Sequence, residues 1–194
     1  MKNNNHKNIL IIIDNQNGFT TTKKTKQISN RIVNLTNSNI FDYQIATQYF
    51  NNINSEKNLF TKLQNWYKLQ DQKEIDYVDN LKYDVSLRKD IYGAVNNEML
   101  QTLKKANNNQ MPQYVFICGM DTECCVLKTC TDLFENGIVP ILLNKYTYSN
   151  SGYFAHDRGI KVFKRLVSPK AFNNQYVLSK QNLKDMIISL NILK

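Results

Sequence analysis

Histidine, proline, glycine and tryptophan are all scarce in this sequence, which holds two, three, six and one of them in 194 residues. Its four cysteines lack the paired C-x-x-C spacing that a structural zinc site needs. Gly18 is the only glycine near the first apolar run, so the glycine-rich turns that cradle phosphates are missing. We therefore expect neither structural zinc nor a nucleotide cofactor.

A secretory leader and long hydrophobic runs are missing as well. Residues 1–7 are polar, and the apolar run 8–13 that follows is far too short to cross a membrane. Four cysteines crowded into one stretch are not typical of a secreted disulfide framework. We expect a cytoplasmic protein without a membrane partner, folded as a single domain over residues 1–194.

Acidic residues are outnumbered, since 25 Lys and Arg stand against 16 Asp and Glu and give a formal net charge of +9. The lysines are scattered along the chain among Asn and Ile and are not gathered in one stripe, as a nucleic-acid-binding protein would favour. We interpret the excess as a property of solvated faces and do not expect a nucleic-acid partner. A basic patch assembled only in the fold stays open.

Apolar runs of strand length alternate with segments of helical spacing along the chain. The runs predict strands at residues 8–13, 41–50, 83–87, 114–117, 138–143 and 177–179. The helical repeats predict helices around residues 28–35, 60–66, 99–103, 126–137, 153–166 and 183–190. This alternation indicates an α/β fold: a three-layer α/β/α, doubly wound domain around a mostly parallel sheet of about six strands.

Residues 114–137 join a strand to a helix through a sharp turn at Gly119. The helix is predicted by a buried repeat at Val126, Cys130, Leu133, Phe134 and Gly137. Cys124 and Cys125 then fall in its first turn, where unpaired N–H groups and the helix dipole favour a thiolate. The same N–H groups can hold an oxyanion.

Three segments, in one order, carry a family resemblance. They are NILIIIDNQNGF at Asn8–Phe19, Lys89-x-x-Tyr92-Gly93-Ala94, and Gly119-x-x-Thr122-x-x-Cys125-Val126. Together they resemble the isochorismatase-like cysteine hydrolases, the superfamily that includes nicotinamidases and N-carbamoylsarcosine amidase. The likeness covers nearly the whole chain and departs at Val95, where the family usually has Phe.

Asp14, Lys89 and Cys125 follow the first, third and fourth predicted strands, so they should meet beyond the carboxyl ends of a parallel sheet. We expect Asp14 and Lys89 to be accessible to solvent there. The resemblance implies that the three form the catalytic triad, with a lowered pKa at Cys125. It also implies an oxyanion hole made by the backbone N–H groups of Asp121 and Cys125, with a cis peptide before Asp121.

The implied reaction is cleavage of a C–N bond in a small amide or carbamoyl compound through a thioacyl-enzyme. Nicotinamidases bind a metal through Asp and His residues after the second strand, but residues 46–52 contain no His. We therefore expect no metal, and we place the chain in a metal-free branch in which Tyr49, Asn51 and Trp66 are candidate substrate contacts. The family also implies a homo-oligomer, either a dimer or a tetramer.

Other assignments stay open at this point. One is vinyl ether hydrolysis of the isochorismatase type, which in that family does not need a thiol at position 125. Another is a basic, non-enzymatic binding module, and a redox pair of Cys125 with Cys124 or Cys130 is disfavoured by its spacing. His156 is the alternative base for Cys125, although we favour a structural role for it, while His6 precedes the first strand at the wrong end of the sheet.

Overall fold

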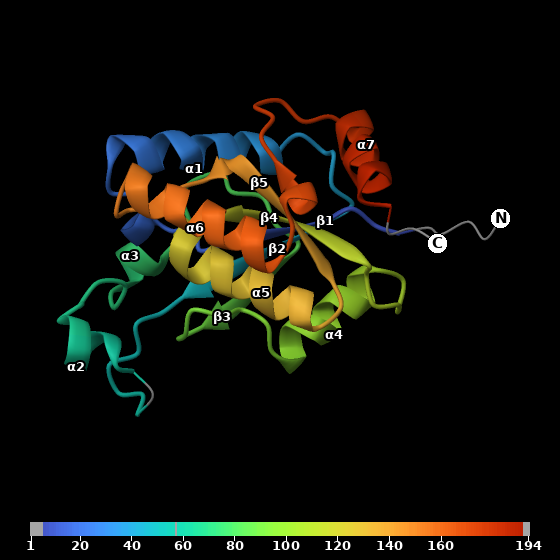
Figure 1. Ribbon diagram of the computed structural model, residues 1–194. Coiled ribbons are helices and arrows are strands. Elements are labelled where there is room, and N and C mark those ends of the chain that lie inside the picture. The colour runs from blue at the N-terminus through green and yellow to red at the C-terminus, as the bar shows by residue number, and fades with distance from the viewer. Residues whose placement is uncertain (1–5, 57, 192–194) are drawn as a thin grey trace.

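The computed structural model of the chain describes residues 6–56 and 58–191. Its strands form one parallel sheet in the order β3-β2-β1-β4-β5-β6, which confirms the predicted α/β fold (Figure 1). The strands are β1 Ile9–Ile13, β2 Tyr43–Tyr49, β3 Val85–Lys89, β4 Tyr114–Gly119, β5 Val139–Thr147 and β6 Phe172–Asn173.

The helices and single turns that connect these strands cover the sheet. The helices are α1 Lys23–Thr36, α2 Phe60–Gln64, α3 Gln72–Ile75, α4 Asn97–Ala106, α5 Leu127–Glu135, α6 Tyr153–Leu166 and α7 Lys180–Leu190. The short turns are η1 Asn17–Phe19, η2 Thr122–Val126 and η3 Pro169–Ala171. Polar side chains define several helix starts, since Thr22, Asn96 and Ser179 each accept a hydrogen bond from a backbone N–H in the first turn.

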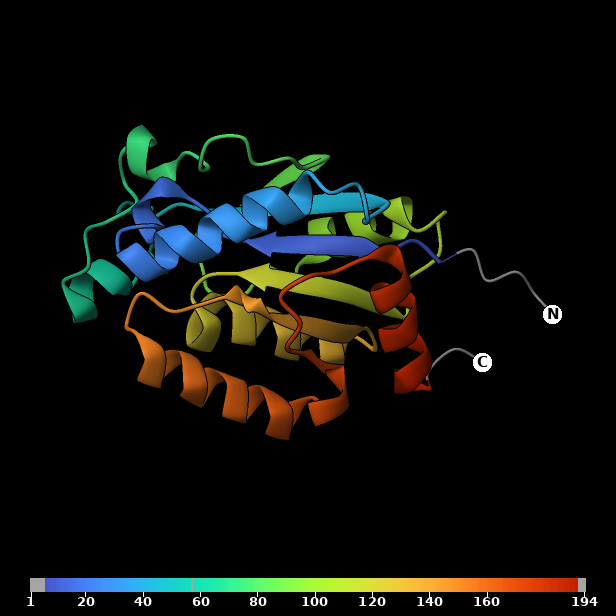
Figure 2. The same cartoon turned by 90° about the horizontal axis from the view of Figure 1, so that it is seen from above.

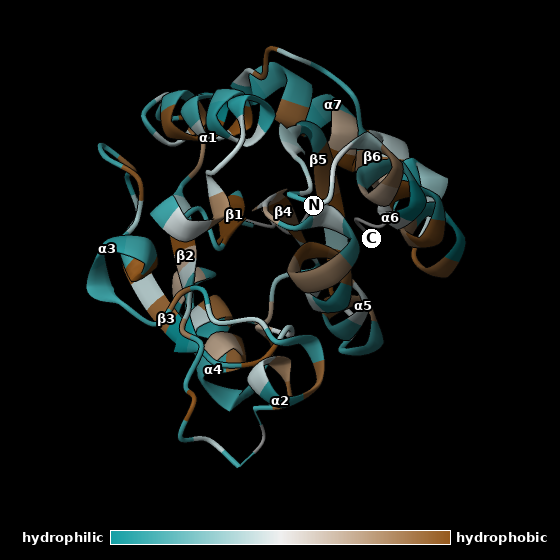
Figure 3. Cartoon of the chain, turned by 90° about the vertical axis from the view of Figure 1, so that its left-hand side faces the viewer, coloured by the Kyte–Doolittle hydropathy of each residue, from teal (hydrophilic) through white to brown (hydrophobic). Residues whose placement is uncertain are grey.

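Strand β1 supplies both halves of the core because successive side chains point to opposite faces of a sheet. Ile9, Ile11 and Ile13 pack with residues of α4, α5 and α6, whereas Leu10 and Ile12 pack with residues of α1 and α7. Figure 2 shows α1 and α7 in front of the strands, and Figure 3 shows hydrophobic strands at the centre with polar outer helix faces. A strand buried on both faces explains the uninterrupted apolar run in the sequence.

The last strand differs from the prediction, which placed it at residues 177–179. The structure has β6 at Phe172–Asn173, where it pairs with Leu142 and Leu143 of β5. Val177 instead lies in a loop with 79% of its surface exposed. Two residues are too few to show the alternation of apolar and polar side chains that identifies a strand. The sequence pattern therefore pointed to the wrong segment. Beyond Leu143 the outer edge of β5 has no strand partner within the described residues.

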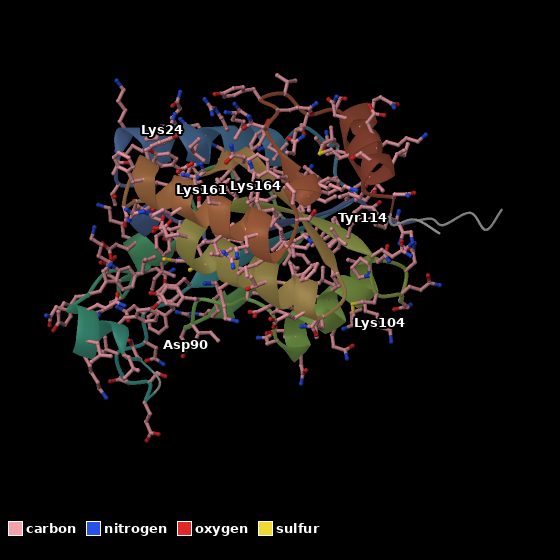
Figure 4. The ribbon with its side chains drawn as sticks, viewed as in Figure 1. Lys24, Asp90, Lys104, Tyr114, Lys161 and Lys164 are labelled. Carbon is pink, nitrogen blue, oxygen red and sulfur yellow. The ribbon has the colours of Figure 1, made fainter. Side chains whose placement is uncertain are left out.

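The basic residues gather in the fold, which corrects the interpretation that they are scattered. Helices α1 and α6 and strand β5 carry nine basic residues against one acidic residue, Asp157. Figure 4 shows Lys24 on α1 close to Lys161 and Lys164 on α6. We call this surface the basic face; it comprises Lys23, Lys24, Lys26, Arg31, Lys145, Arg158, Lys161, Lys164 and Arg165. Among the described helices, none has the length and hydropathy needed to span a membrane.

Candidate active site

Asp14 and Lys89 form a buried ion pair at the carboxyl edge of the sheet. Lys89 Nζ lies 2.7 Å from Asp14 Oδ2, and the two side chains are 5% and 0% exposed. Asp14 Oδ1 accepts a hydrogen bond of 2.6 Å from the Thr47 hydroxyl, and Lys89 Nζ donates to the Ile91 carbonyl at 3.1 Å. The expectation that both residues are accessible to solvent is therefore wrong. Loops that follow the strands cover this edge.

The backbone of Asp14 turns its side chain toward that edge. Its φ of 49° lies in the left-handed region, which Asp tolerates better than most residues. Its backbone N–H donates to Thr47 Oγ1 at 3.1 Å, so the Thr47 hydroxyl fixes both the main chain and the carboxylate. Thr47 was not among the site residues predicted from the sequence.

Gly119 lets the nucleophile turn pass directly over the end of β1. A Cβ atom at this position would lie 2.0 Å from the carbonyl oxygen of Ile13, and the φ of 125° also favours glycine. The next residue, Met120, donates its N–H to that same carbonyl at 2.9 Å. The Met120–Asp121 peptide is cis, as the family resemblance implies.

The two neighbouring thiols lie in η2, a π-helical turn that precedes α5, and not in the first turn of a regular α-helix. Cys125 is 4% exposed and interacts with both Asp14 and Lys89, while Cys124 is half-buried and has Glu123 and Asp121 as its charged neighbours. The structure thus brings Asp14, Lys89 and Cys125 together.

The expected lowering of the Cys125 pKa is wrong. Burial raises the pKa of its thiol well above the ordinary value, the Lys89 ammonium opposes this, and the Asp14 carboxylate adds to it. For Lys89, burial lowers the pKa, but the charges of Asp14 and Cys125 more than offset this, and the net change is upward. The resting site therefore holds a neutral thiol beside an ammonium group.

A backbone donor is available where the oxyanion was expected. Among the described residues, the Asp121 N–H has no backbone or side-chain acceptor. The Asp121 side chain is held separately, because its Oδ1 accepts hydrogen bonds from the backbone and side-chain nitrogens of Asn150 at 2.8 and 2.9 Å. The N–H of Cys125 belongs to the same turn, which places both proposed donors next to the thiol.

His156 packs behind the turn. Its Nδ1 lies 2.8 Å from the Thr122 hydroxyl, and its ring lies 5.2 Å from that of Tyr148. Burial lowers its pKa, which favours the neutral ring. Three residues further along α6, Gly159 approaches the Glu123 backbone so closely that a Cβ atom would lie 2.8 Å from Glu123 Cα. Through its contact with Thr122, His156 thus positions the η2 turn.

A cavity of about 230 Å³ opens above Cys125. Tyr49 and Trp66 line it, as expected, but Asn51 does not. Asn51 instead ties loops together, since its amide nitrogen donates to the carbonyls of Trp66 and Lys68. The full lining is Phe19, Tyr49, Phe60, Gln64, Trp66, Tyr92, Asp121, Glu123, Cys124, Cys125 and Ser151.

Besides Cys124, six of these lining residues were not identified as site residues from the sequence: Phe19, Phe60, Gln64, Tyr92, Glu123 and Ser151. Phe19 and Tyr92 stand in segments that carry the family resemblance, and Phe60 begins a predicted helix, but no pattern in the sequence places them around one cavity. Glu123 stands beside the thiols in the sequence, and that proximity is the one signal that points to it.

The loop after β2 offers few ligands for a metal ion. Within the described residues, no group of three or more His, Cys, Asp or Glu side chains can hold an ion. The loop after β2 supplies amides instead, and Asn58 donates to Asn51 Oδ1 at 2.6 Å. Neutral amides already engaged with each other are poor zinc ligands.

Comparison with known proteins gives one family. Residues 8–173 match the model of a family described as Isochorismatase, with an isochorismatase domain. No curated protein sequence matches the chain at the level required.

Among solved structures, the chain is similar to an isochorismatase-like hydrolase from Alkaliphilus metalliredigens, with a TM-score of 0.67 and 17% identity over 83% of this chain and 92% of that one. It is also similar to a nicotinamidase/pyrazinamidase from Bacillus subtilis, with a TM-score of 0.68 and 19% identity over 81% and 94%. A pyrazinamidase of Pyrococcus horikoshii in complex with zinc has a TM-score of 0.68 and 19% identity over 87% and 99%. At sequence identities of 17% and 19%, the similarity to these structures shows a shared fold only.

Proposed function

Because this chain belongs to the isochorismatase family, we propose that it is a cysteine hydrolase that cleaves the C–N bond of a small amide or carbamoyl compound. One observation carries the proposal: a buried thiol, carboxylate and ammonium group meet at the floor of a small cavity. That arrangement supplies a nucleophile, a base and a positive charge, which are the groups that covalent amide hydrolysis requires.

The first half of the reaction forms a thioacyl-enzyme. Asp14 accepts the proton of Cys125, and the Lys89 ammonium stabilises the thiolate as it attacks the amide carbonyl. The backbone N–H groups of Asp121 and Cys125 donate to the resulting oxyanion. When the C–N bond breaks, Asp14 returns its proton to the leaving nitrogen, and ammonia or an amine departs.

The second half releases the acid. Asp14, again ionised, takes a proton from a water molecule, whose oxygen attacks the thioester. The C–S bond breaks, Cys125 regains its proton, and the carboxylic acid or carbamic acid leaves. Since each step uses only the side chains present, we propose that the reaction needs no metal.

A screen for ammonia release from small amides, ureas and carbamoyl compounds tests the proposal, with Cys125→Ala as the blank. Nicotinamide and pyrazinamide belong in the screen because relatives of the same fold are named for them. We expect release by the wild-type protein in the presence of a chelator. Release that Cys125→Ala retains would contradict the thioacyl mechanism, and activity that a chelator removes and zinc restores would contradict independence from metal.

A further inference from the structure

We propose that this cavity selects amides whose far end carries a positive charge, such as a quaternary ammonium group, and that it rejects carboxylates. The proposal deepens the proposed function, since it names the substrate class of the same site. It rests on the charge of the cavity wall, on the rings that form the wall, and on a buried hydroxyl that lacks a partner.

The wall carries negative charge without a compensating cation among the described residues. Asp121 and Glu123 line the cavity, and its described lining contains no Lys or Arg. Lys89 lies close by, but Asp14 neutralises it at 2.7 Å. A carboxylate entering the cavity would therefore meet two like charges, and an ammonium group would meet two opposite ones.

Glu123 has an oxygen left over for a ligand. Its Oε1 accepts a hydrogen bond of 2.6 Å from the Ser149 hydroxyl. Its Oε2 is buried and has no hydrogen-bond partner in the part of the chain that the structure describes. A buried carboxylate oxygen without a partner is costly, and a cation in the cavity removes that cost.

Aromatic rings make up nearly half of the lining. Phe19, Tyr49, Phe60, Trp66 and Tyr92 all line the cavity, and Lys89 Nζ already lies 5.0 Å from the centre of the Tyr49 ring. They contact one another, with ring centroids 6.0 Å apart for Tyr49 and Phe60, 5.8 Å for Tyr49 and Trp66, and 4.8 Å for Phe60 and Tyr92. Adjacent ring faces around a small space attract quaternary ammonium ions through their quadrupoles.

Tyr49 adds an independent sign that a ligand belongs here. The residue is only 2% exposed, yet its hydroxyl has no hydrogen-bond partner within residues 6–56 and 58–191. Burial is the main cause that raises its pKa, followed by the charges of Cys125 and Asp14, so the hydroxyl stays protonated and can donate. The hydroxyl would be satisfied by donating to a substrate carbonyl in the cavity or by accepting from a substrate amide N–H.

Trp66 allows a binding test that does not depend on turnover, because it is the only tryptophan in the sequence and it lines the cavity. Cys125→Ala protein is titrated with tetramethylammonium chloride, with the uncharged analogue tert-butanol and with sodium acetate at equal ionic strength. Binding is followed by Trp66 emission and by calorimetry. We expect saturable binding of the ammonium ion alone.

Two variants distinguish the effect of a charge in the cavity wall from the effect of the protein's net charge. Glu123→Gln should weaken tetramethylammonium binding at least fivefold, on the order of the effect of one nearby charge. Glu135→Gln, an exposed acidic residue near the end of α5, changes net charge equally and should leave binding unchanged. Equal affinity for tert-butanol, or an unchanged Glu123→Gln variant, overturns the proposal.

Turnover of three matched amides tests the preference for a cationic substrate separately from the proposed amidase activity. They are γ-trimethylammonio-butyramide, its carbon isostere with a tert-butyl group, and glutaramic acid. We expect kcat/KM to be at least about tenfold higher for the cation than for the isostere, lowest for the acid, and the ratio of cation to isostere to fall in Glu123→Gln. Hydrolysis without this preference overturns the substrate class alone. Ammonium binding without hydrolysis of any amide overturns the amidase function alone.

Discussion

The protonation states of the three buried groups at the site depend on one another. These groups belong to Asp14, Lys89 and Cys125. The thiol is neutral at rest, since burial raises its pKa, and the ammonium group beside it can stabilise a thiolate only when the proton moves. Asp14 is the neighbouring acceptor for that proton, and Thr47 and Lys89 hold its two oxygens. For the proposed mechanism this means that the thiolate forms only as Asp14 takes the proton during attack, because the raised pKa keeps the Cys125 thiol neutral at neutral pH.

The two adjacent thiols should differ sharply when each is replaced. Cys125→Ser removes the nucleophile beside Asp14 and Lys89, so we expect turnover to fall by at least about a thousandfold. Cys124→Ser changes a half-buried cavity residue that has no such partners and should keep most activity. Ammonia release by folded variants is the measurement, and an inactive Cys124→Ser protein beside an active Cys125→Ser protein would reverse the assignment.

The ion pair should couple stability to catalysis. Asp14→Asn and Lys89→Met each leave one buried charge without its partner, which typically costs about 3–5 kcal/mol. Each single variant should therefore unfold at lower urea and lose turnover. The double variant removes both charges and should recover part of the lost stability while it stays inactive.

Urea unfolding followed by circular dichroism measures the first effect, and ammonia release measures the second. If the double variant is destabilised by the sum of the two single changes, Asp14 and Lys89 are not coupled. If either single variant keeps near-normal turnover, the triad assignment fails.

The affinity of the cavity for a quaternary ammonium ion should depend on pH. Burial raises the pKa of Asp121 to about 6, while two hydrogen bonds from Asn150 oppose this. As pH falls through that value, the cavity loses one of its two negative charges, so binding should weaken. Cys124 and Cys125 keep their protons in this range because burial raises both pKa values.

Calorimetric titration of Cys125→Ala protein from about pH 5 to about pH 8 measures this dependence. The same titration of a Cys125→Ala/Asp121→Asn protein should show a weaker and flatter profile. His156 lies behind the turn on Thr122 and also titrates, with a pKa that burial lowers. A His156→Asn control separates its contribution, and an unchanged slope with Asp121→Asn would exclude Asp121 as the source.

At the scale of elements, the turn between β4 and α5 is where backbone geometry governs the site. Gly119→Ala places a Cβ atom 2.0 Å from the Ile13 carbonyl oxygen, so β4 and β1 cannot keep their register. We expect a protein that fails to fold or that is severely destabilised. Gly137→Ala is the matched control, because its φ is also positive, at 76°, but the space around it is open.

Thermal unfolding and soluble yield compare the two variants. Gly137→Ala should cost only about 1 kcal/mol, the usual penalty for a non-glycine residue in the left-handed region. Equal losses in both variants would mean that conformational freedom, and not the close approach to Ile13, is what Gly119 provides.

The sequence predicted those strands and helices whose hydrophobic pattern is contained in one continuous segment. The four isoleucines and one leucine of β1 and the span of α6 each gave a pattern that the fold confirms. The repeat of α5 is confirmed in part, since Val126, Cys130 and Leu133 are buried but Phe134 and Gly137, predicted on the same face, are exposed. The convergence of Asp14, Lys89 and Cys125 followed from the rule for parallel sheets. The cavity wall did not, because Phe60 begins α2 and Tyr92 lies in the loop after β3, and a contact between such separate segments, with ring centroids 4.8 Å apart, leaves no periodic pattern in the sequence.

For the whole molecule, charge is distributed unevenly between two surfaces. The basic face holds most of the excess positive charge, while the cavity wall is acidic. A second cavity of about 390 Å³ opens on the basic face and is lined by Lys24, Arg31, Lys145 and Lys164 together with tyrosines such as Tyr148 and Tyr176. Adding up charges along the sequence could not reveal this, because α1 and α6 are far apart in the chain.

Retention on a heparin column should depend on where a charge lies and not only on net charge. Lys24→Glu reverses an exposed charge on the basic face, and Lys104→Glu reverses an exposed charge on α4, away from it (Figure 4). Both variants have the same net charge. We expect Lys24→Glu to elute at clearly lower salt, because fewer clustered cations then meet the polyanion. Coincident elution would mean that the basic face does not act as a unit.

Because β6 is short, no described strand pairs with the outer edge of β5 from Asn144 to Thr147, where the Arg31 guanidinium reaches the Lys145 carbonyl, at 3.4 Å. Exposed strand edges are templates on which another chain can add a strand and begin to aggregate. Lys145 lies on this stretch, and Arg31 stands close by, with both cations over the ring of Tyr176 at 4.5 and 4.9 Å. A second copy arriving edge to edge would bring its own Lys145 toward these charges. Repulsion of this kind weakens with salt, so the chain's resistance to aggregation should be greatest in dilute buffer and should fall as ionic strength rises.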